Sequence, residues 1–106
     1  MKQYKVRITD KALADMDAIY EYIAAVLGAP ETAMKQYNWI ADGIESLNVF
    51  PERCKLFDSP AERELGMRQL RVDNYSAVYV VDEDTVTVLR VLYGASDLSA
   101  RLQNDR

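Results

Sequence analysis

The chain opens with a strict alternation of polar and apolar side chains. The apolar side chains on one side of this stretch are Tyr4, Val6 and Ile8. A period of two predicts a β-strand with one buried face. The spacing of apolar residues then changes to three and four, which predicts an amphipathic helix capped by Thr9 or Asp10. Its apolar stripe consists of Leu13, Met16, Tyr20, Ile23 and Leu27.

A second helical stripe follows after a very short link. Gly28 suits the left-handed residue that ends a helix, and Pro30 suits the first turn of the next one. The second stripe consists of Ala33, Tyr37, Ile40, Ile44 and Leu47, and it ends before Phe50. Two stripes of similar length joined by so short a link predict an antiparallel helical hairpin.

The second half of the chain contains three further strand-like runs. Residues 51–65 hold two prolines and several charges without any period, which predicts a surface loop or short irregular turns. The strand-like runs after it are Met67 to Val72, Tyr75 to Val81 and Thr85 to Leu92. The polar links of two and three residues between these runs predict antiparallel neighbours. Asp97 to Gln103 is predicted to be a short helix or a tail.

This order of elements predicts an α+β fold with two layers. The elements follow one another as β-α-α-β-β-β with a short C-terminal helix or tail. The apolar stripes of the two helices and the apolar face of the strands must be buried against each other, so we expect the hairpin to pack on a small, mainly antiparallel sheet. The 106 residues leave room for a single domain, residues 1–106.

The composition narrows the location and the chemistry of the protein. No apolar stretch approaches the roughly 18 residues of a membrane span, and no signal peptide is visible, so we expect a cytoplasmic protein. Cys54 is the only cysteine and there is no histidine, which excludes imidazole catalysis and histidine-ligated zinc. We therefore expect no metal and no cofactor. Any chemistry must use arginine, lysine, tyrosine or carboxylates.

The charge disfavours a broad nucleic-acid groove. The chain has 17 acidic and 13 basic residues, a formal net charge of −4, and neither half is strongly basic. Extended binding of phosphates usually needs a positive field.

Three arginines and one tyrosine are the candidate functional residues. Arg90 lies in the middle of an apolar strand, on the side of Val86, Val88 and Leu92 by strand parity, while Arg68 and Arg71 face opposite sides of an earlier strand. Each arginine forms a salt bridge with one of the carboxylates, or the three cluster on the face or rim of the sheet that the helices leave open. A cluster would bind a phosphate or the carboxylates of a partner. Tyr93, followed by Gly94, ends its strand, where a phenol can point outward.

Several stretches resemble the RelE/ParE superfamily of bacterial type II toxins. They include YKVRITDKALADMDAIYEYI, AMKQYNWIADGIESLNVFP, LRVDNYSAVYVVD and VTVLRVLYGASD, and they cover nearly the whole chain. The resemblance implies a growth-inhibiting toxin, of the kind associated with plasmid stabilization, that a cognate antitoxin neutralises. It also implies that the pair binds operator DNA only through the antitoxin.

The superfamily contains two main activities. ParE-like members poison DNA gyrase, whereas RelE-like members are endoribonucleases that cut messenger RNA on the ribosome. Arg71 matches an arginine that the nucleases place on the phosphate, but Glu62-Arg63-Glu64 stands where they carry lysines. Gly94-Ala95-Ser96 stands where they carry a basic residue or histidine. Relatives of the ParE type also often have histidine at Tyr93 and arginine at Ser76.

We therefore expect a ParE-like toxin that binds gyrase and is not an enzyme. The first alternative is an endoribonuclease, an mRNA interferase with Arg71 and Tyr93 as catalytic residues and the ribosome with its messenger as partner. The second is a relic that has lost toxicity and only binds antitoxin. In each case Arg68, Arg71, Arg90 and Tyr93 are the expected contacts to the antitoxin or target.

Overall fold

The computed structural model describes residues 2–94, which form a two-layer α+β fold. Strand β1 (Lys5–Ile8) leads into helix α1 (Asp10–Glu21), a π-helical turn (Tyr22–Val26) and helix α2 (Pro30–Glu45). After short 3-10 turns and the small helix α3 (Pro60–Glu64) come strands β2 (Arg68–Val72), β3 (Tyr75–Asp82) and β4 (Thr85–Tyr93). This confirms the predicted fold class and element order. The prediction for Asp97 to Gln103 lies outside the described residues.

The sheet has the strand order β1-β4-β3-β2. Strands β2, β3 and β4 form an antiparallel meander, and β1 pairs with β4 in parallel, from Lys5↔Thr85 to Ile8↔Val88. Beyond Ile8 the chain leaves the sheet, and Thr9 accepts the N–H of Ala12 at the start of α1. The sheet is therefore mainly antiparallel, as the short polar links predicted.

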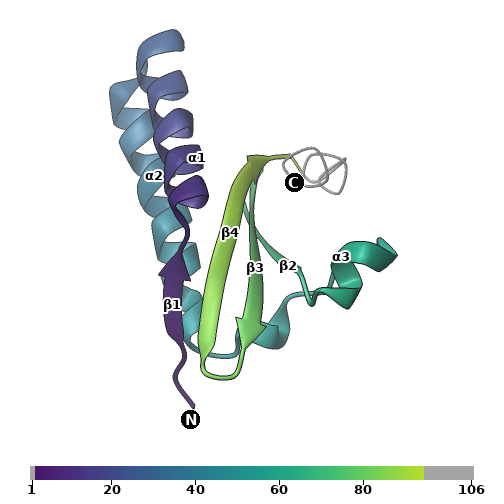
Figure 1. Ribbon diagram of the computed structural model, residues 1–106. Coiled ribbons are helices and arrows are strands. Elements are labelled where there is room, and N and C mark those ends of the chain that lie inside the picture. Colours follow the sequence, from purple (N-terminus) through teal and green to yellow (C-terminus); the bar gives the residue numbers. More distant parts are fainter. Residues whose placement is uncertain (1, 95–106) are drawn as a thin grey trace.

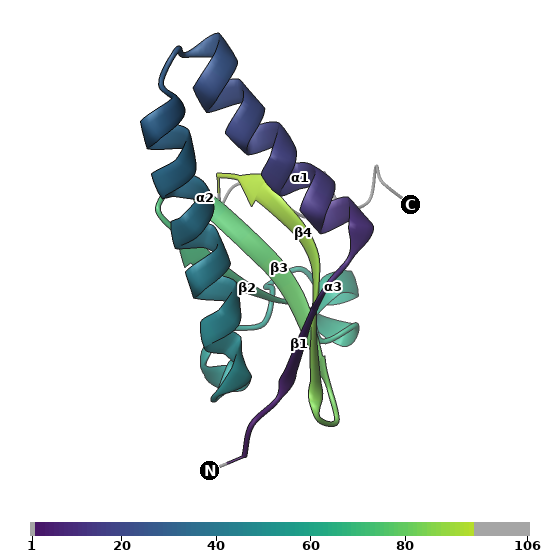
Figure 2. The same cartoon turned by 90° about the vertical axis from the view of Figure 1, so that its left-hand side faces the viewer.

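Helices α1 and α2 run side by side as an antiparallel hairpin over one face of the sheet (Figures 1 and 2). The core between the layers contains buried residues from both helices and from β3 and β4, namely Ala12, Met16, Ile40, Ile44, Leu47, Ala77, Tyr79, Val86, Val88 and Val91. Helix α2 comes close to β2 at Gly43, where an added Cβ atom would lie 2.8 Å from Cγ2 of Val72. The predicted apolar stripe of α2 is largely confirmed, because Ala33, Ile40, Ile44 and Leu47 are buried.

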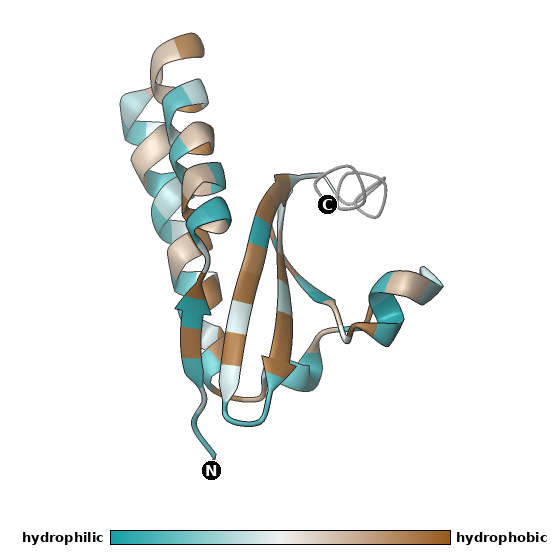
Figure 3. Cartoon of the chain, in the orientation of Figure 1, coloured by the Kyte–Doolittle hydropathy of each residue, from teal (hydrophilic) through white to brown (hydrophobic). Residues whose placement is uncertain are grey.

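The predicted stripe of the first helix is wrong at both ends. Leu13 is 41% exposed and Leu27 is 58% exposed, and Ala12 is buried in place of Leu13. The last turn is a π-helix, in which the N–H of Leu27 bonds to the carbonyl of Tyr22 at 3.1 Å. A π-turn holds one more residue than an α-turn, so it rotates the following side chains away from the expected face. Figure 3 shows the resulting apolar tip of the hairpin.

A β-bulge in β4 changes which residues share a face. The register between β3 and β4 shifts at Val78/Tyr79, so Val78 pairs with Arg90 and Tyr79 pairs with Val88. Leu92 therefore packs in a second apolar cluster on the other face of the sheet, with Phe57 and Met67. The prediction that Arg90 and Leu92 share a side with Val86 and Val88 is wrong for this reason.

Residues 51–65 are more ordered than a plain loop. They include a 3-10 turn (Pro51–Arg53), a bridge between Leu56 and Arg68, and helix α3. In the part of the chain that the structure describes, no helix is long and apolar enough to cross a membrane.

Candidate partner-binding groove

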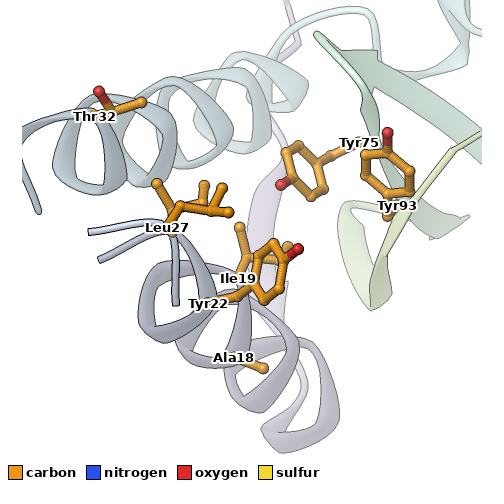
Figure 4. Close-up of a pocket in the computed structure, with 8 residues that line it drawn as sticks. Ala18, Ile19, Tyr22, Leu27, Thr32, Tyr75 and Tyr93 are labelled. Atoms are coloured by element: carbon orange, nitrogen blue, oxygen red, sulfur yellow. The ribbon is translucent and has the colours of Figure 1, made fainter. Parts of the chain in front are cut away.

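An apolar groove lies between the tip of the helical hairpin and the end of the sheet. It encloses about 700 Å³. The residues that line it come from α1, the π-turn, α2, β3 and β4 and are Ala18, Ile19, Tyr22, Ile23, Leu27, Thr32, Tyr75 and Tyr93. Figure 4 shows Tyr75 and Tyr93 on the sheet side, with Tyr22, Ile19 and Leu27 on the side of the hairpin. A hollow of this size can take several side chains of a partner.

Three of the residues that line the groove are tyrosines, namely Tyr22, Tyr75 and Tyr93. The rings of Tyr75 and Tyr93 meet edge to face, with centroids 5.5 Å apart. Burial raises the pKa of the Tyr75 phenol, and the nearby phenols of Tyr93 and Tyr22 raise it further. Tyr22 is 53% exposed and Tyr93 is 60% exposed, so both rings present apolar area that the fold itself does not cover. Exposed aromatic rings with a polar tip are typical of protein interfaces.

The π-turn is the local feature that places the helical side of the groove. Its backbone bond joins Leu27 to Tyr22, and the side chains of both residues line the groove. The carbonyl of Ile23 also accepts the N–H of Ala29 at 3.0 Å, so two backbone bonds of π spacing or longer close the tip. Single π-turns within α-helices are frequent at functional sites.

The structure gives Arg90 an internal partner. Its Nε and Nη2 atoms donate to the two carboxylate oxygens of Asp15 on α1, at 2.7 and 2.9 Å. One oxygen of Asp15 also accepts the backbone N–H of Val91, at 2.9 Å, beyond the point where β1 stops pairing with β4. The hydrogen bonds that Arg90 donates to the Asp15 carboxylate are the main cause of the raised pKa of Arg90. Arg90 therefore ties α1 to the sheet.

Arg68 also forms hydrogen bonds within the chain. Its Nη1 atom donates to the carbonyls of Cys54, at 2.6 Å, and Glu52, at 3.2 Å. Arg68 pairs across the strands with the buried Tyr79, which places it on the helix side of β2 and not on the open face. The hydroxyl of Tyr79 in turn donates to the carbonyl of Pro51. Arg68 thus fixes the segment after α2 to the edge of the sheet.

Arg71 is exposed, but it does not share a surface with Tyr93. Arg71, Ser76 and Leu92 form one row across the sheet, and Val72, Tyr75 and Tyr93 form the next row. Adjacent rows of a sheet point to opposite faces. The Tyr93 row faces the hairpin, whereas the Leu92 row faces the second apolar cluster. The expected cluster of three arginines on the open face is therefore not formed.

Sequence reasoning found Tyr93 but missed the rest of the groove. Tyr75 packs partly against the core between the layers and also lines the groove, and Tyr22 was not singled out because the π-turn has no clear sequence pattern. Glu62 lies in the stretch predicted to be a surface loop or short irregular turns, but its side chain is fully buried and accepts a hydrogen bond from the hydroxyl of Ser59 at 3.1 Å. Within residues 2–94 no group of acidic or cysteine side chains could hold a metal ion.

The two-layer architecture is that of small toxins from toxin–antitoxin complexes. A structure of a chromosomal ParDE toxin–antitoxin system from P. aeruginosa is similar, with 26% identity and a TM-score of 0.74, over 90% of this chain and 100% of that one. The RelBE2 toxin–antitoxin complex of Mycobacterium tuberculosis (24% identity, 91% and 97% coverage, TM-score 0.60) shares the fold. YafQ of E. coli (12% identity, 93% and 98% coverage, TM-score 0.53) shares it as well.

The sequence identifies the family to which the chain belongs. Residues 6–98 match the family described as the ParE toxin of the type II toxin-antitoxin system, parDE. The chain belongs to this family of toxins. A search of curated proteins found no match.

Proposed function

We propose that this protein is the active toxin of a type II module, that a cognate antitoxin neutralises it, and that the free toxin inhibits growth by binding DNA gyrase. The family and the 26% identity to a chain of a ParDE system support the first two parts. The binding of DNA gyrase is proposed because gyrase is the target expected for ParE-like toxins.

The main argument against RNA cleavage is that Arg71 and Tyr93 lie on opposite faces of the sheet. Cleavage of a phosphodiester needs a base for the 2′ proton, positive charge on the phosphate and an acid for the leaving oxygen, all at one place. Arg71 and Tyr93 lie in adjacent rows that point to opposite faces, and Arg68 and Arg90 are bonded inside the fold. The chain has no histidine to replace them. This arrangement favours a binding protein over a nuclease.

The groove is the surface that we propose for the antitoxin. It combines a hollow of about 700 Å³ with three large apolar side chains, Tyr22, Leu27 and Tyr93, that are each more than half exposed. Such surfaces are typical sites for a segment of a partner protein. Occupation of the groove by the antitoxin would also cover Tyr93, which we propose as a contact to the target.

The test compares the toxin with and without its partner. Inducing the chain alone should stop colony formation, and co-expression with the small reading frame next to its gene should restore it. The purified chain should inhibit supercoiling by gyrase and leave messenger RNA on ribosomes intact.

Two variants separate the target hypotheses. Tyr93→Ala should weaken toxicity, whereas Arg7→Ala, a change of an exposed arginine on β1, should not. Messenger cleavage on ribosomes that disappears in Arg71→Ala would instead establish the nuclease. A chain that binds antitoxin but never affects growth would be the non-toxic relic.

A further inference from the structure

The helical side of the groove belongs to a stretch of the hairpin, residues 12–34, in which every formally charged residue is acidic. Between Lys11 and Lys35 the sequence contains no lysine or arginine, and it contains four acidic residues. These residues are Asp15, Asp17, Glu21 and Glu31. The charge of Asp15 is matched by Arg90, and the other three side chains are exposed. The helical side of the groove is therefore acidic.

Glu21 lies next to the groove. It directly precedes Tyr22 and follows the lining residue Ala18 by three positions, so it shares the flank of α1 with Ala18. Asp17 lies one turn before Glu21 on the same flank. Glu31 occupies the first turn of α2 beside Thr32, another lining residue. On both helices an acidic residue therefore stands next to a lining residue in the sequence, as Asp17 does to Ala18, Glu21 to Tyr22 and Glu31 to Thr32.

The sheet does not offset this charge. It contributes Tyr75 and Tyr93 to the lining, and the exposed Asp73 stands in the turn before Tyr75. Arg71 belongs to the row that faces away from the groove. Lys35 lies one turn beyond Thr32 on α2 and is the nearest basic residue that follows the hairpin tip in the sequence.

We propose that the groove selects an amphipathic segment of a protein partner that brings lysine or arginine residues beside its apolar anchors. The apolar side chains fill the hollow among Tyr22, Leu27 and Tyr93. The basic side chains lie over Asp17, Glu21 and Glu31, where opposite charge speeds association and rejects acidic segments. This deepens the proposed function and rests on it, because the segment is taken to belong to the antitoxin. It reverses the expectation that partner carboxylates bind the arginines of the sheet.

Two probe peptides test this inference with the purified chain. Both have about 18 residues, long enough to form a helix in contact, and the same leucine stripe at helical spacing. The remaining positions are lysine in one peptide and glutamate in the other. Fluorescence anisotropy of labelled peptide measures affinity at low and at physiological salt. Backbone amide NMR shifts of the protein locate the binding site.

We expect the lysine peptide to bind at least about tenfold more tightly than the glutamate peptide, with the difference shrinking as salt is added. Glu21→Lys should weaken the lysine peptide severalfold. Glu45→Lys, the same change at an exposed acid near the other end of α2, should have no such effect. Leu27→Ala should weaken both peptides, whereas Met34→Ala, at an exposed residue outside the lining, should not.

Several results would overturn the inference. They are equal or tighter binding of the glutamate peptide, no binding of either peptide, and binding that Glu21→Lys or Leu27→Ala leaves unchanged. Thermal melts of each variant show whether it is folded. If the peptides fail while the neighbouring gene product still neutralises the toxin, the inference about charge is refuted and the proposed function stands.

Discussion

Asp15 on α1 forms hydrogen bonds to two residues of β4, Arg90 and Val91. Replacing Asp15 should therefore weaken the contact between α1 and β4 and lower the stability of the fold. The carboxylate accepts two bonds from the Arg90 guanidinium and one from the N–H of Val91. Both side chains of the ion pair are only 17% exposed. Removing one partner of a buried pair costs about 3–5 kcal/mol, because the other charge remains without compensation.

We expect Asp15→Ala to lower the free energy of unfolding by about 3 kcal/mol, near the low end of that range because the pair keeps some contact with water. A small domain has a total stability of about 5–15 kcal/mol, so this loss is easily resolved by urea denaturation. The exposed Asp17 on the same helix is the control, and Asp17→Ala should change stability by less than about 0.5 kcal/mol.

A double variant distinguishes the ion pair from simple packing. Asp15→Leu combined with Arg90→Met replaces both charges by apolar side chains. It should regain part of the stability that Asp15→Ala loses, and the rest stays lost because the N–H of Val91 still lacks its acceptor. The reasoning is refuted if Asp15→Ala is as stable as Asp17→Ala. It is also refuted if the double variant is no more stable than Asp15→Ala.

Three further changes test other contacts. Gly43→Ala should destabilise the fold by about 1 kcal/mol or more despite its higher helix propensity, because the new Cβ atom would lie 2.8 Å from Val72; urea denaturation measures it. Tyr79→Phe should cost about 1 kcal/mol at neutral pH through loss of the bond to Pro51. Burial raises the pKa of Tyr79 above its ordinary 10.0, so the wild-type protein should lose stability as pH rises past about 10, where the unfolded chain ionises first, and Tyr79→Phe should lose less. Leu27→Ala should leave the melting temperature nearly unchanged, since its side chain is 58% exposed, yet reduce neutralisation by the antitoxin in growth assays.

The order of elements could be predicted because apolar periods are local and strong. The alternation at the start of β1, the stripe of α2 and the short polar turns of the meander each correspond to an observed element. In a helix or a strand, backbone geometry alone sets which residues point toward the core, so the spacing of apolar residues reveals the element.

The site could not be predicted in the same way, because it depends on two irregularities. After the π-turn Leu27 is exposed at the groove and does not continue the buried stripe, and the bulge in β4 moves Arg90 and Leu92 out of phase with Val86 and Val88. Both insert one residue into a regular repeat, which changes the direction of every later side chain in that element. The pairing of Arg90 with Asp15 joins residues 75 positions apart, a distance at which a single sequence gives no signal.

Backbone NMR of the labelled toxin, free and bound to its antitoxin, tests the location of the partner surface most directly. The account predicts that the amide shifts change most at residues 18–27 and around Tyr75 and Tyr93. Changes confined to the other face of the sheet, around Phe57, Met67 and Arg71, would contradict it.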